Sequence, residues 1–229
     1  MVAKNALARS IFGGLSGSYD SVLDWMTLRQ DRTWKRRMLE KLALGGAESI
    51  LDVGCGTGVL EEDYELGESN VVGVDLTSGM IRLAQGKSLR SLSMLGLADA
   101  EHLPFRESTF EVVISCYVPK YCDGTRFVEE LGRVLRPGGK MAVYDFTRPH
   151  GYFATLLNLY VDWFMPTFGR LVSPLDPSLA FTCSVLPGLI RSTTWKEDVD
   201  AALAGNRLSK DGEDEMTGGV VTILWASKK

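Results

Sequence analysis

The residues best suited to chemistry form a glycine-rich turn, Gly54-Cys55-Gly56-Thr57-Gly58, which Asp52 precedes closely. Glycine permits positive φ angles and lets a ligand approach the backbone. The apolar run before the turn predicts a strand and the residues after it a helix, whose first N–H groups have no partner within the helix. A turn of this kind can hold a nucleotide-like ligand.

Acidic and polar residues end the neighbouring predicted strands. Asp75 ends the next strand, 23 residues after Asp52, where a carboxylate can accept both ribose hydroxyls of a nucleoside cofactor. Asp99 and Ser115 end the third and fourth strands. Because ligands bind at the carboxyl ends of strands in open α/β sheets, we expect both residues to face the same crevice.

The spacing of the glycines distinguishes two classes of cofactor. A dinucleotide site prefers G-x-G-x-x-G, whereas here Gly54, Gly56 and Gly58 are followed by Val59 in the place of the third glycine of that pattern. A carboxylate at Asp52 suits an ammonium group and would repel a pyrophosphate. We therefore expect S-adenosyl-L-methionine (SAM) rather than a nicotinamide cofactor.

The elements that position these residues alternate along the chain. The segment up to about Leu44 has helical apolar spacing. Strands are predicted over 49–53, 71–75, 94–98, 112–116, 141–146 and 220–226, and helices over 80–87, 126–135 and 195–204. This order predicts an α/β, Rossmann-like fold: a seven-stranded, mostly parallel sheet with helices on both faces, an N-terminal helical segment and a helical insertion after the fifth strand.

The sixth strand is the least secure part of that fold. The segment Asn206 to Glu215 is too polar for a buried strand, and Gly212 interrupts it. The length of 229 residues and the 45% hydrophobic content fit a single domain. We divide it into an N-terminal helical segment (1–45), a cofactor-binding core (46–146), a helical insertion or lid (147–205) and C-terminal strands (206–229).

The amino-acid composition narrows the set of possible functions and locations. A net charge of −4 does not favour a nucleic-acid binder. Four cysteines without a C-x-x-C pair and only two histidines predict no zinc or other metal site. Scattered cysteines suit a reducing cytosol, and neither a signal peptide nor a membrane-spanning run is apparent. We therefore expect a cytoplasmic protein.

These motifs together resemble those of the class I SAM-dependent methyltransferases. Asp52–Gly58 is similar to their first motif, Asp75 to their second, Ala98–Phe105 to their third, and Val134–Gly139 to the turn before their fifth strand. The resemblance implies that SAM is bound and S-adenosyl-L-homocysteine is released. With it, the predicted cofactor-binding residues are Asp52, Gly54, Gly56, Thr57, Asp75, Leu76, Asp99, Ala100 and Ser115.

More narrowly, the chain resembles the ubiquinone/menaquinone biosynthesis C-methyltransferases along nearly its whole length. Tyr19-Asp20 with Trp34, the segment Arg133–Pro149, and Thr217–Val221 carry this likeness. Two stretches depart from that family. Tyr117-Val118-Pro119-Lys120 stands where the family has a G-L-R-N-like run, and Cys183–Leu189 where it has a Y-x-Y-L-x-x-S-like run.

The acceptor side is therefore less defined than the cofactor side. Methylation of a quinol carbon requires a group that favours the phenolate. By position, Tyr19 and His150 are the predicted catalytic residues, and Asp145 and Arg148 are further candidates. A surface role for His150 stays open. The apolar segment Tyr152 to Val172 allows a lid, a wall of an acceptor pocket or a membrane-surface contact.

The sequence thus predicts transfer of a methyl group from SAM to an apolar small molecule, with a quinol or aromatic ring carbon as the favoured acceptor. O- or N-methylation of a soluble metabolite is an alternative. So are a nicotinamide-dependent oxidoreductase and a non-catalytic SAM-binding regulator. A peripheral membrane contact and a homodimer stay open as partner interactions.

Overall fold

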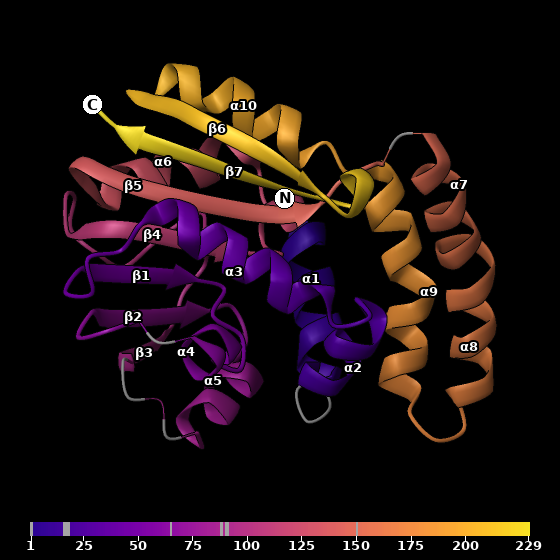
Figure 1. Cartoon of the computed structure of the whole chain (residues 1–229). Helices are drawn as coiled ribbons and strands as arrows, with labels where there is room; N and C mark the ends of the chain where they lie inside the picture. The colour runs from indigo at the N-terminus through magenta and orange to yellow at the C-terminus, as the bar shows by residue number, and fades with distance from the viewer. Residues whose placement is uncertain (1, 16–18, 65, 88, 90–91, 150) are drawn as a thin grey trace.

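One twisted sheet organises the molecule (Figure 1). The structure, a computed structural model, describes residues 2–15, 19–64, 66–87, 89, 92–149 and 151–229. Seven strands of these residues form the sheet in the order β3-β2-β1-β4-β5-β7-β6. Their bounds are β1 (Ser49–Val53), β2 (Asn70–Asp75), β3 (Leu92–Leu97), β4 (Phe110–Cys116), β5 (Leu135–Phe146), β6 (Leu208–Met216) and β7 (Val221–Lys228). Strands β1 to β5 pair in parallel, and β7 pairs antiparallel with both β5 and β6.

Three groups of helices accompany the sheet. The N-terminal group is α1 (Val2–Leu15), α2 (Tyr19–Met26) and α3 (Gln30–Leu42). The helices between the parallel strands are α4 (Val59–Asp63), α5 (Ser78–Gln85), the 3-10 turn η1 (Pro119–Tyr121) and α6 (Gly124–Val134). After β5 come α7 (Gly151–Leu159), the π-helical η2 (Tyr160–Phe164), α8 (Met165–Val172), α9 (Pro177–Ser192), α10 (Trp195–Gly205) and, after β6, the 3-10 turn η3 (Thr217–Gly219). No helix among the described residues is long and apolar enough to cross a membrane.

Side chains alternate between the two faces of the sheet along each strand, and this produces two apolar layers. In β1, Leu51 and Val53 pack with side chains of α6 and α10 on one face, and Ile50 packs with side chains of α3 on the other. Burial of large side chains in both layers stabilises the sheet, since a fully buried Leu, Ile or Phe contributes roughly 1.5–3 kcal/mol. The helix residues are Phe127, Leu131, Trp195 and Val199 on the first face and Trp34, Met38 and Leu42 on the second.

The predicted fold is confirmed, including the helical insertion after β5, and β6 is formed. The polarity of β6 reflects its position at the edge of the sheet, where only β7 pairs with it. Charged residues are typical of such edges because they oppose pairing with another chain. Gly212, which interrupts the sequence pattern, lies beside a shift in the register of the β6–β7 pair. The segment is therefore an exposed strand rather than a buried one.

The strand order places a crevice at the middle of the sheet. The chain runs outward from β1 to β2 and β3, then crosses back to β4 on the other side of β1. Ligands of open α/β proteins bind where the order reverses, at the carboxyl ends of the strands. The loops after β1, β2, β3 and β4 meet at this end, and α1 and α2 lie next to them (Figure 1).

Candidate functional site

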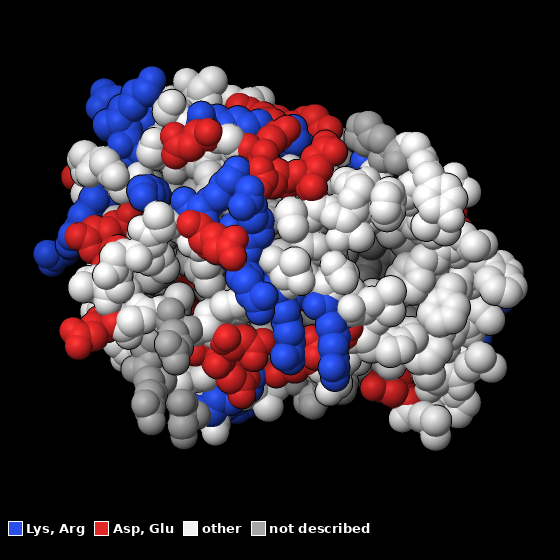
Figure 2. Space-filling model, in the orientation of Figure 1, with Lys and Arg blue, Asp and Glu red and all other residues white. Residues whose placement is uncertain are grey.

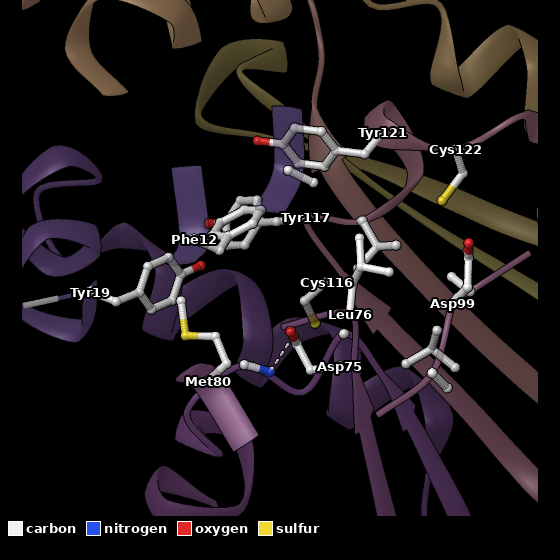
Figure 3. A pocket seen from close by; sticks show the side chains of 17 residues that line it. Phe12, Tyr19, Asp75, Leu76, Met80, Asp99, Cys116, Tyr117, Tyr121 and Cys122 are labelled. Carbon is white, nitrogen blue, oxygen red and sulfur yellow. Dashed lines mark hydrogen bonds between the residues drawn. The ribbon is translucent and has the colours of Figure 1, made fainter. Parts of the chain in front are cut away.

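A cavity lies at the carboxyl ends of β1, β2 and β4, and we call it the first cavity. It encloses about 640 Å³, including solvent space at its mouth, which is in the range of small-molecule sites. The lining residues come from the glycine turn, from the ends of the strands and from helices α1 and α2 (Figure 3). The site therefore combines segments from the first 20 residues with the sheet.

The glycine turn is shaped by its backbone hydrogen bonds. The N–H groups of Gly54 and Cys55 both donate to the carbonyl of Val74, at 2.7 and 3.0 Å. Gly54 has a φ of 79°, and a Cβ there would lie 2.1 Å from Cγ2 of Val118. Gly56 has a φ of 58° and open space beside its Cα. Because Gly56 lines the first cavity, any side chain at this position would take up ligand space.

Asp75 is held at the wall of the first cavity by three donors. The Gly56 N–H donates to Oδ2 at 3.1 Å, a bond drawn in Figure 3. Oδ1 accepts from the N–H and the hydroxyl of Thr77, each at 2.8 Å. Burial raises the pKa of the Asp75 carboxyl above its ordinary value, and these hydrogen bonds oppose the rise. The carboxylate is thus pre-oriented toward a ligand.

The chemistry of the first cavity fits SAM. Two carboxylates, Asp75 and Asp99, line it for hydroxyl and ammonium groups, and Leu76 and Met80 provide apolar surface for a base. The open space at Gly56 allows close approach to the backbone. The described residues that line this cavity include no lysine or arginine that could bind a pyrophosphate. This donor set favours a nucleoside with a cationic tail over a dinucleotide.

Most residues of the predicted cofactor set come together here. The lining includes the predicted residues Gly54, Gly56, Asp75, Leu76, Asp99 and Ala100 and also Tyr19. Asp52, Thr57 and Ser115 are buried and do not line the first cavity. His150 lies outside the described residues, so its predicted catalytic role stays a prediction.

The expectation that Ser115 faces the crevice is not met. Its side chain is fully buried, and the hydroxyl donates to the carbonyl of Val53 at 2.7 Å, tying β4 to β1. Side chains alternate along a strand, and the next two residues, Cys116 and Tyr117, line the first cavity instead. The predicted end of β4 at Cys116 is observed, but Cys116 rather than Ser115 lines the first cavity.

Asp52 and Thr57 lie behind the glycine turn. Asp52 is buried beside the equally buried Glu61, and no N–H or O–H of the described residues satisfies Asp52 Oδ1 or either oxygen of Glu61. Burial raises the pKa of both carboxyls. Thr57 donates its hydroxyl to the Asp20 carboxylate of α2. Thr57 therefore connects the turn to the N-terminal helices.

The N-terminal helices close one side of the first cavity. Phe12 of α1 and Tyr19 of α2 line it, and their rings meet edge to face at 5.8 Å. The Arg9 guanidinium donates to the carbonyl of Leu76 at 3.0 Å. The Lys87 ammonium lies 2.9 Å from the Asp20 carboxylate. These contacts attach α1 to the loop after β2 and α2 to the segment after α5.

A second cavity adjoins the first. It encloses about 500 Å³ with its mouth and is lined mainly by apolar side chains, among them Met26 of α2 and Leu186 of α9. Both cavities are lined by the same four aromatic residues, which are Phe12, Tyr19, Tyr117 and Tyr121. A molecule in the second cavity would therefore lie directly beside one in the first.

Among the described residues that line the second cavity, Lys120 is the one with a charged side chain. Sequence reasoning did not identify it as a functional residue. Lys120 lies in η1, four residues after the end of β4, and no motif in the sequence singles it out. Phe12 and Tyr121 were missed for the same reason: α1 and η1 carry no motif, and only the tertiary fold brings these residues to the cavity. Of the other acceptor-side candidates, Asp145 is fully buried against Lys120, and Arg148 is exposed and lines neither cavity.

Known proteins resemble this chain in both sequence and fold. The ubiE/COQ5 methyltransferase family matches residues 1–228. A demethylmenaquinone methyltransferase from Mycolicibacterium gilvum is 32% identical over 226 residues, covering 96% of this chain and 93% of the relative. A ubiquinone/menaquinone biosynthesis C-methyltransferase from Idiomarina loihiensis is 27% identical over 233 residues, covering 96% and 90%.

Solved structures agree on the fold at low sequence identity. The crystal structure of geranyl diphosphate C-methyltransferase from Streptomyces coelicolor, with S-adenosyl-L-homocysteine bound, has a TM-score of 0.58 at 14% identity and covers 88% of this chain and 80% of its own. A methyltransferase from Haloferax volcanii, solved with its Trm112 activator, has a TM-score of 0.63 at 14% identity, covering 94% and 96%. The chain belongs to the ubiE/COQ5 methyltransferase family and is a SAM-dependent methyltransferase.

Proposed function

We propose that the acceptor is a reduced, prenylated naphthoquinone, demethylmenaquinol, which the enzyme methylates at a ring carbon to give menaquinol. Demethylmenaquinone methyltransferases are among the relatives that match nearly the whole chain. The observation that carries the proposal is the second cavity, which is apolar and shares four aromatic residues with the first. These rings suit a flat aromatic acceptor placed next to the methyl donor.

The reaction depends mainly on alignment. SAM supplies an electrophilic methyl group on a sulfonium, whose departure as a neutral thioether is favourable. The protein must hold the acceptor carbon in line with that methyl and exclude water, and positioning of this kind can supply about 7–11 kcal/mol. Phe12, Tyr19 and Tyr121 form the shared wall. Their closely packed rings restrict the orientation of an aromatic acceptor.

Tyr19 can assist as a hydrogen-bond donor. Burial raises the pKa of its hydroxyl well above the ordinary value, and the charge of Asp31 raises it further. The hydroxyl therefore keeps its proton at neutral pH. In that form Tyr19 could donate to an acceptor oxygen, whereas a role as a base would require a lower pKa.

An exposed apolar stripe supports an acceptor that resides in a membrane. Tyr152, Leu156, Leu159 and Trp163 recur at helical spacing along α7 and η2, and each is at least 43% exposed. Charged side chains gather over the sheet, whereas the visible face over α7 to α9 is almost free of them (Figure 2). We assign this stripe to a peripheral contact with the lipid surface.

The apolar surface reaches the second cavity. The ring of Trp25 stacks on Phe168 at 4.4 Å, and Trp25 precedes Met26, which lines the cavity. On the other side, the half-exposed Phe181 precedes the cavity residue Thr182. A prenyl tail could follow this path while the ring occupies the cavity.

We place the enzyme on the cytoplasmic side of the membrane because its four cysteines are free.

The test is transfer of a labelled methyl group from SAM to reduced extracts of the source cells, separated into lipid and aqueous fractions. We expect the label in the lipid fraction. Label found only in the aqueous fraction would contradict the quinol assignment and favour O- or N-methylation of a soluble metabolite. Binding of SAM without transfer to either fraction would instead favour a non-catalytic regulator.

A further inference from the structure

Lys120 occupies an unusual position for a lysine. Its side chain is 2% exposed, yet it lines the second cavity. The Nζ atom lies 2.7 Å from Oδ1 of Asp145 and donates to the carbonyl of Tyr117 at 2.7 Å. The Lys120 N–H donates to Oδ2 of the same carboxylate at 3.1 Å. An ammonium has three N–H groups, so these two acceptors leave one donor for another partner.

Aromatic rings surround the remaining face of the ammonium. Nζ lies 4.5 Å from the ring centre of Tyr121 and 5.3 Å from that of Tyr117. Both rings belong to the wall shared by the two cavities. The amine is therefore next to the place where an acceptor ring would meet the methyl donor.

A buried ion pair is weak support for stability, because desolvation of both charges can exceed their attraction. The chain has a second pair of this kind, Lys35 and Asp31, 2.8 Å apart and equally buried. That pair lines neither cavity. It reaches the shared wall through Tyr117, whose hydroxyl donates to Oδ1 of Asp31 at 2.8 Å, whereas Lys120 lines the second cavity itself.

We propose that Lys120, held in place by Asp145, contacts the acceptor hydroxyl and takes its proton when the ring carbon is methylated. This inference rests on the proposed quinol acceptor. It also explains a departure from the family pattern. Pro119 stands where the G-L-R-N-like run has its arginine, and Lys120 is the charged residue of the same loop.

The step balances without another reagent. The acceptor O–H bond breaks and its proton moves to the neutral amine of Lys120, leaving a phenolate. The ring carbon forms a bond to the methyl group while the C–S bond breaks, and that electron pair goes to sulfur. The ring C–H bond then breaks, its electron pair restores aromaticity and its proton goes to water. Lys120 returns the first proton to the oxygen, so the net release is one proton.

The surroundings of Lys120 reduce the free-energy cost of its neutral, unprotonated form. Burial lowers the pKa of Lys120, although the Asp145 charge opposes the shift. Burial likewise raises the pKa of Asp145. The titratable groups near the amine are Asp145 of β5, Tyr117 and Tyr121 at and after the end of β4, and Cys122. Both shifts are in the direction that lowers the free-energy cost of the neutral amine, which is the form that accepts a proton.

The first test measures ionisation of a bound acceptor analogue in the absence of SAM. A nitronaphthol changes colour when its hydroxyl loses a proton, so its spectrum reports the bound phenolate fraction. The variant is Lys120→Met with Asp145→Asn, which leaves no unpaired buried charge. We expect the wild type to lower the apparent pKa of the bound ligand and the double variant to lose this effect. The control, Lys41→Met with Asp214→Asn, removes an ion pair that lines neither cavity and should behave like the wild type.

The second test measures turnover of reduced demethylmenaquinone by the same proteins, with SAM affinity and melting temperature as controls. We expect kcat of the Lys120 double variant to fall about 10²- to 10⁴-fold with SAM affinity unchanged. For a fluorinated quinol, whose hydroxyl ionises more readily, the ratio of wild-type kcat to variant kcat should be at least tenfold smaller.

Three outcomes would overturn the inference. Wild-type kcat in the Lys120 double variant, or an equal loss in the Lys41 control, would assign Lys120 a structural role only. Unchanged ionisation of the nitronaphthol would exclude contact with the hydroxyl. A wild type that methylates no quinol would overturn the proposed acceptor, and the Lys120 role with it.

Discussion

The backbone N–H of Gly56 donates a hydrogen bond to the carboxylate of Asp75 across 3.1 Å. This bond connects the glycine turn after β1 to the end of β2, two motifs that lie 19 residues apart in the chain. Each therefore positions the other at the wall of the first cavity. Loss of either partner should affect the cofactor more than the fold.

Replacement of Asp75 by Ala should weaken SAM binding at least tenfold. Hydrogen bonds to charged groups contribute about 1.5–3 kcal/mol each, and about 1.4 kcal/mol corresponds to a factor of ten. Titration calorimetry measures the effect. Asp214→Asn is the control, because Asp214 pairs with Arg37 and Lys41 far from the cavity. Unchanged affinity in Asp75→Ala would remove this residue from the ribose site.

A comparison of Gly56→Ala with Gly138→Ala should distinguish the loss of ligand space from the effect of backbone strain. Gly56 and Gly138 both have positive φ angles, 58° and 76°, with nothing within 4 Å of a built Cβ. Each substitution to Ala should lower the free energy of unfolding by roughly 1–2 kcal/mol, since the left-handed region is unfavourable for L-residues. Only Gly56 lines the cavity, so only Gly56→Ala should also weaken SAM binding. Equal SAM affinities of the two variants would contradict the assigned position of the ligand.

Glu61→Gln should stabilise the SAM-free enzyme at neutral pH. Among the residues that the structure describes, no donor satisfies Oδ1 of Asp52 or either oxygen of Glu61, and burial raises the pKa of both carboxyls. The folded state then binds more protons than the unfolded state. The contribution of these two carboxyls to the free energy of unfolding is therefore fully present below their unfolded pKa of about 4. It decreases as the pH rises toward their raised pKa values in the folded state. Gln supplies an N–H donor to Asp52 in place of a shared proton.

Urea unfolding at several pH values tests this. We expect the variant to gain about 1–3 kcal/mol at neutral pH and to match the wild type in acid. A variant that is less stable at neutral pH would show that the two carboxyls do not repel each other.

The sequence predicted the sheet well because its strands are short apolar runs that end in glycine or acidic residues. Ser49–Val53 is observed with the predicted bounds. β5 begins at Leu135 rather than at Met141, because Leu135 already pairs with Phe110 before the register shifts. Pairing between strands is a tertiary property that apolar periodicity does not report.

Part of the lining of the first cavity could be predicted from the sequence, whereas the lining of the second could not. Asp75 and Asp99 follow from the strand-end rule. Ser115 was wrongly oriented by one position, since a shift of one residue along a strand reverses the side chain. Phe12 and Lys120 depend on how α1 and η1 pack against the sheet, and no local pattern specifies that packing.

The double substitution Leu159→Ser with Trp163→Ser should reduce binding to anionic lipid vesicles at least tenfold. Both side chains are more than 60% exposed in the apolar stripe, and burial of apolar area in a bilayer surface drives such binding. Turnover of a short-tailed quinol should stay unchanged. The matched control is Leu97→Ser, which removes a side chain 58% exposed on β3, at the edge of the sheet opposite β6.

Co-sedimentation and sedimentation velocity together decide the role of the stripe. Unchanged vesicle binding by the double variant would exclude it as the membrane contact. A wild-type dimer that the double variant converts to a monomer would assign the stripe to a homodimer interface instead.

The most direct test of the central claim is mass spectrometry of the product formed by the purified enzyme from SAM and reduced demethylmenaquinone. The account predicts one added methyl group, located by fragmentation on the naphthoquinol ring carbon, and no product with Asp75→Ala at limiting SAM. A methyl group on oxygen, or no methylated quinol with wild-type enzyme that binds SAM, would contradict it.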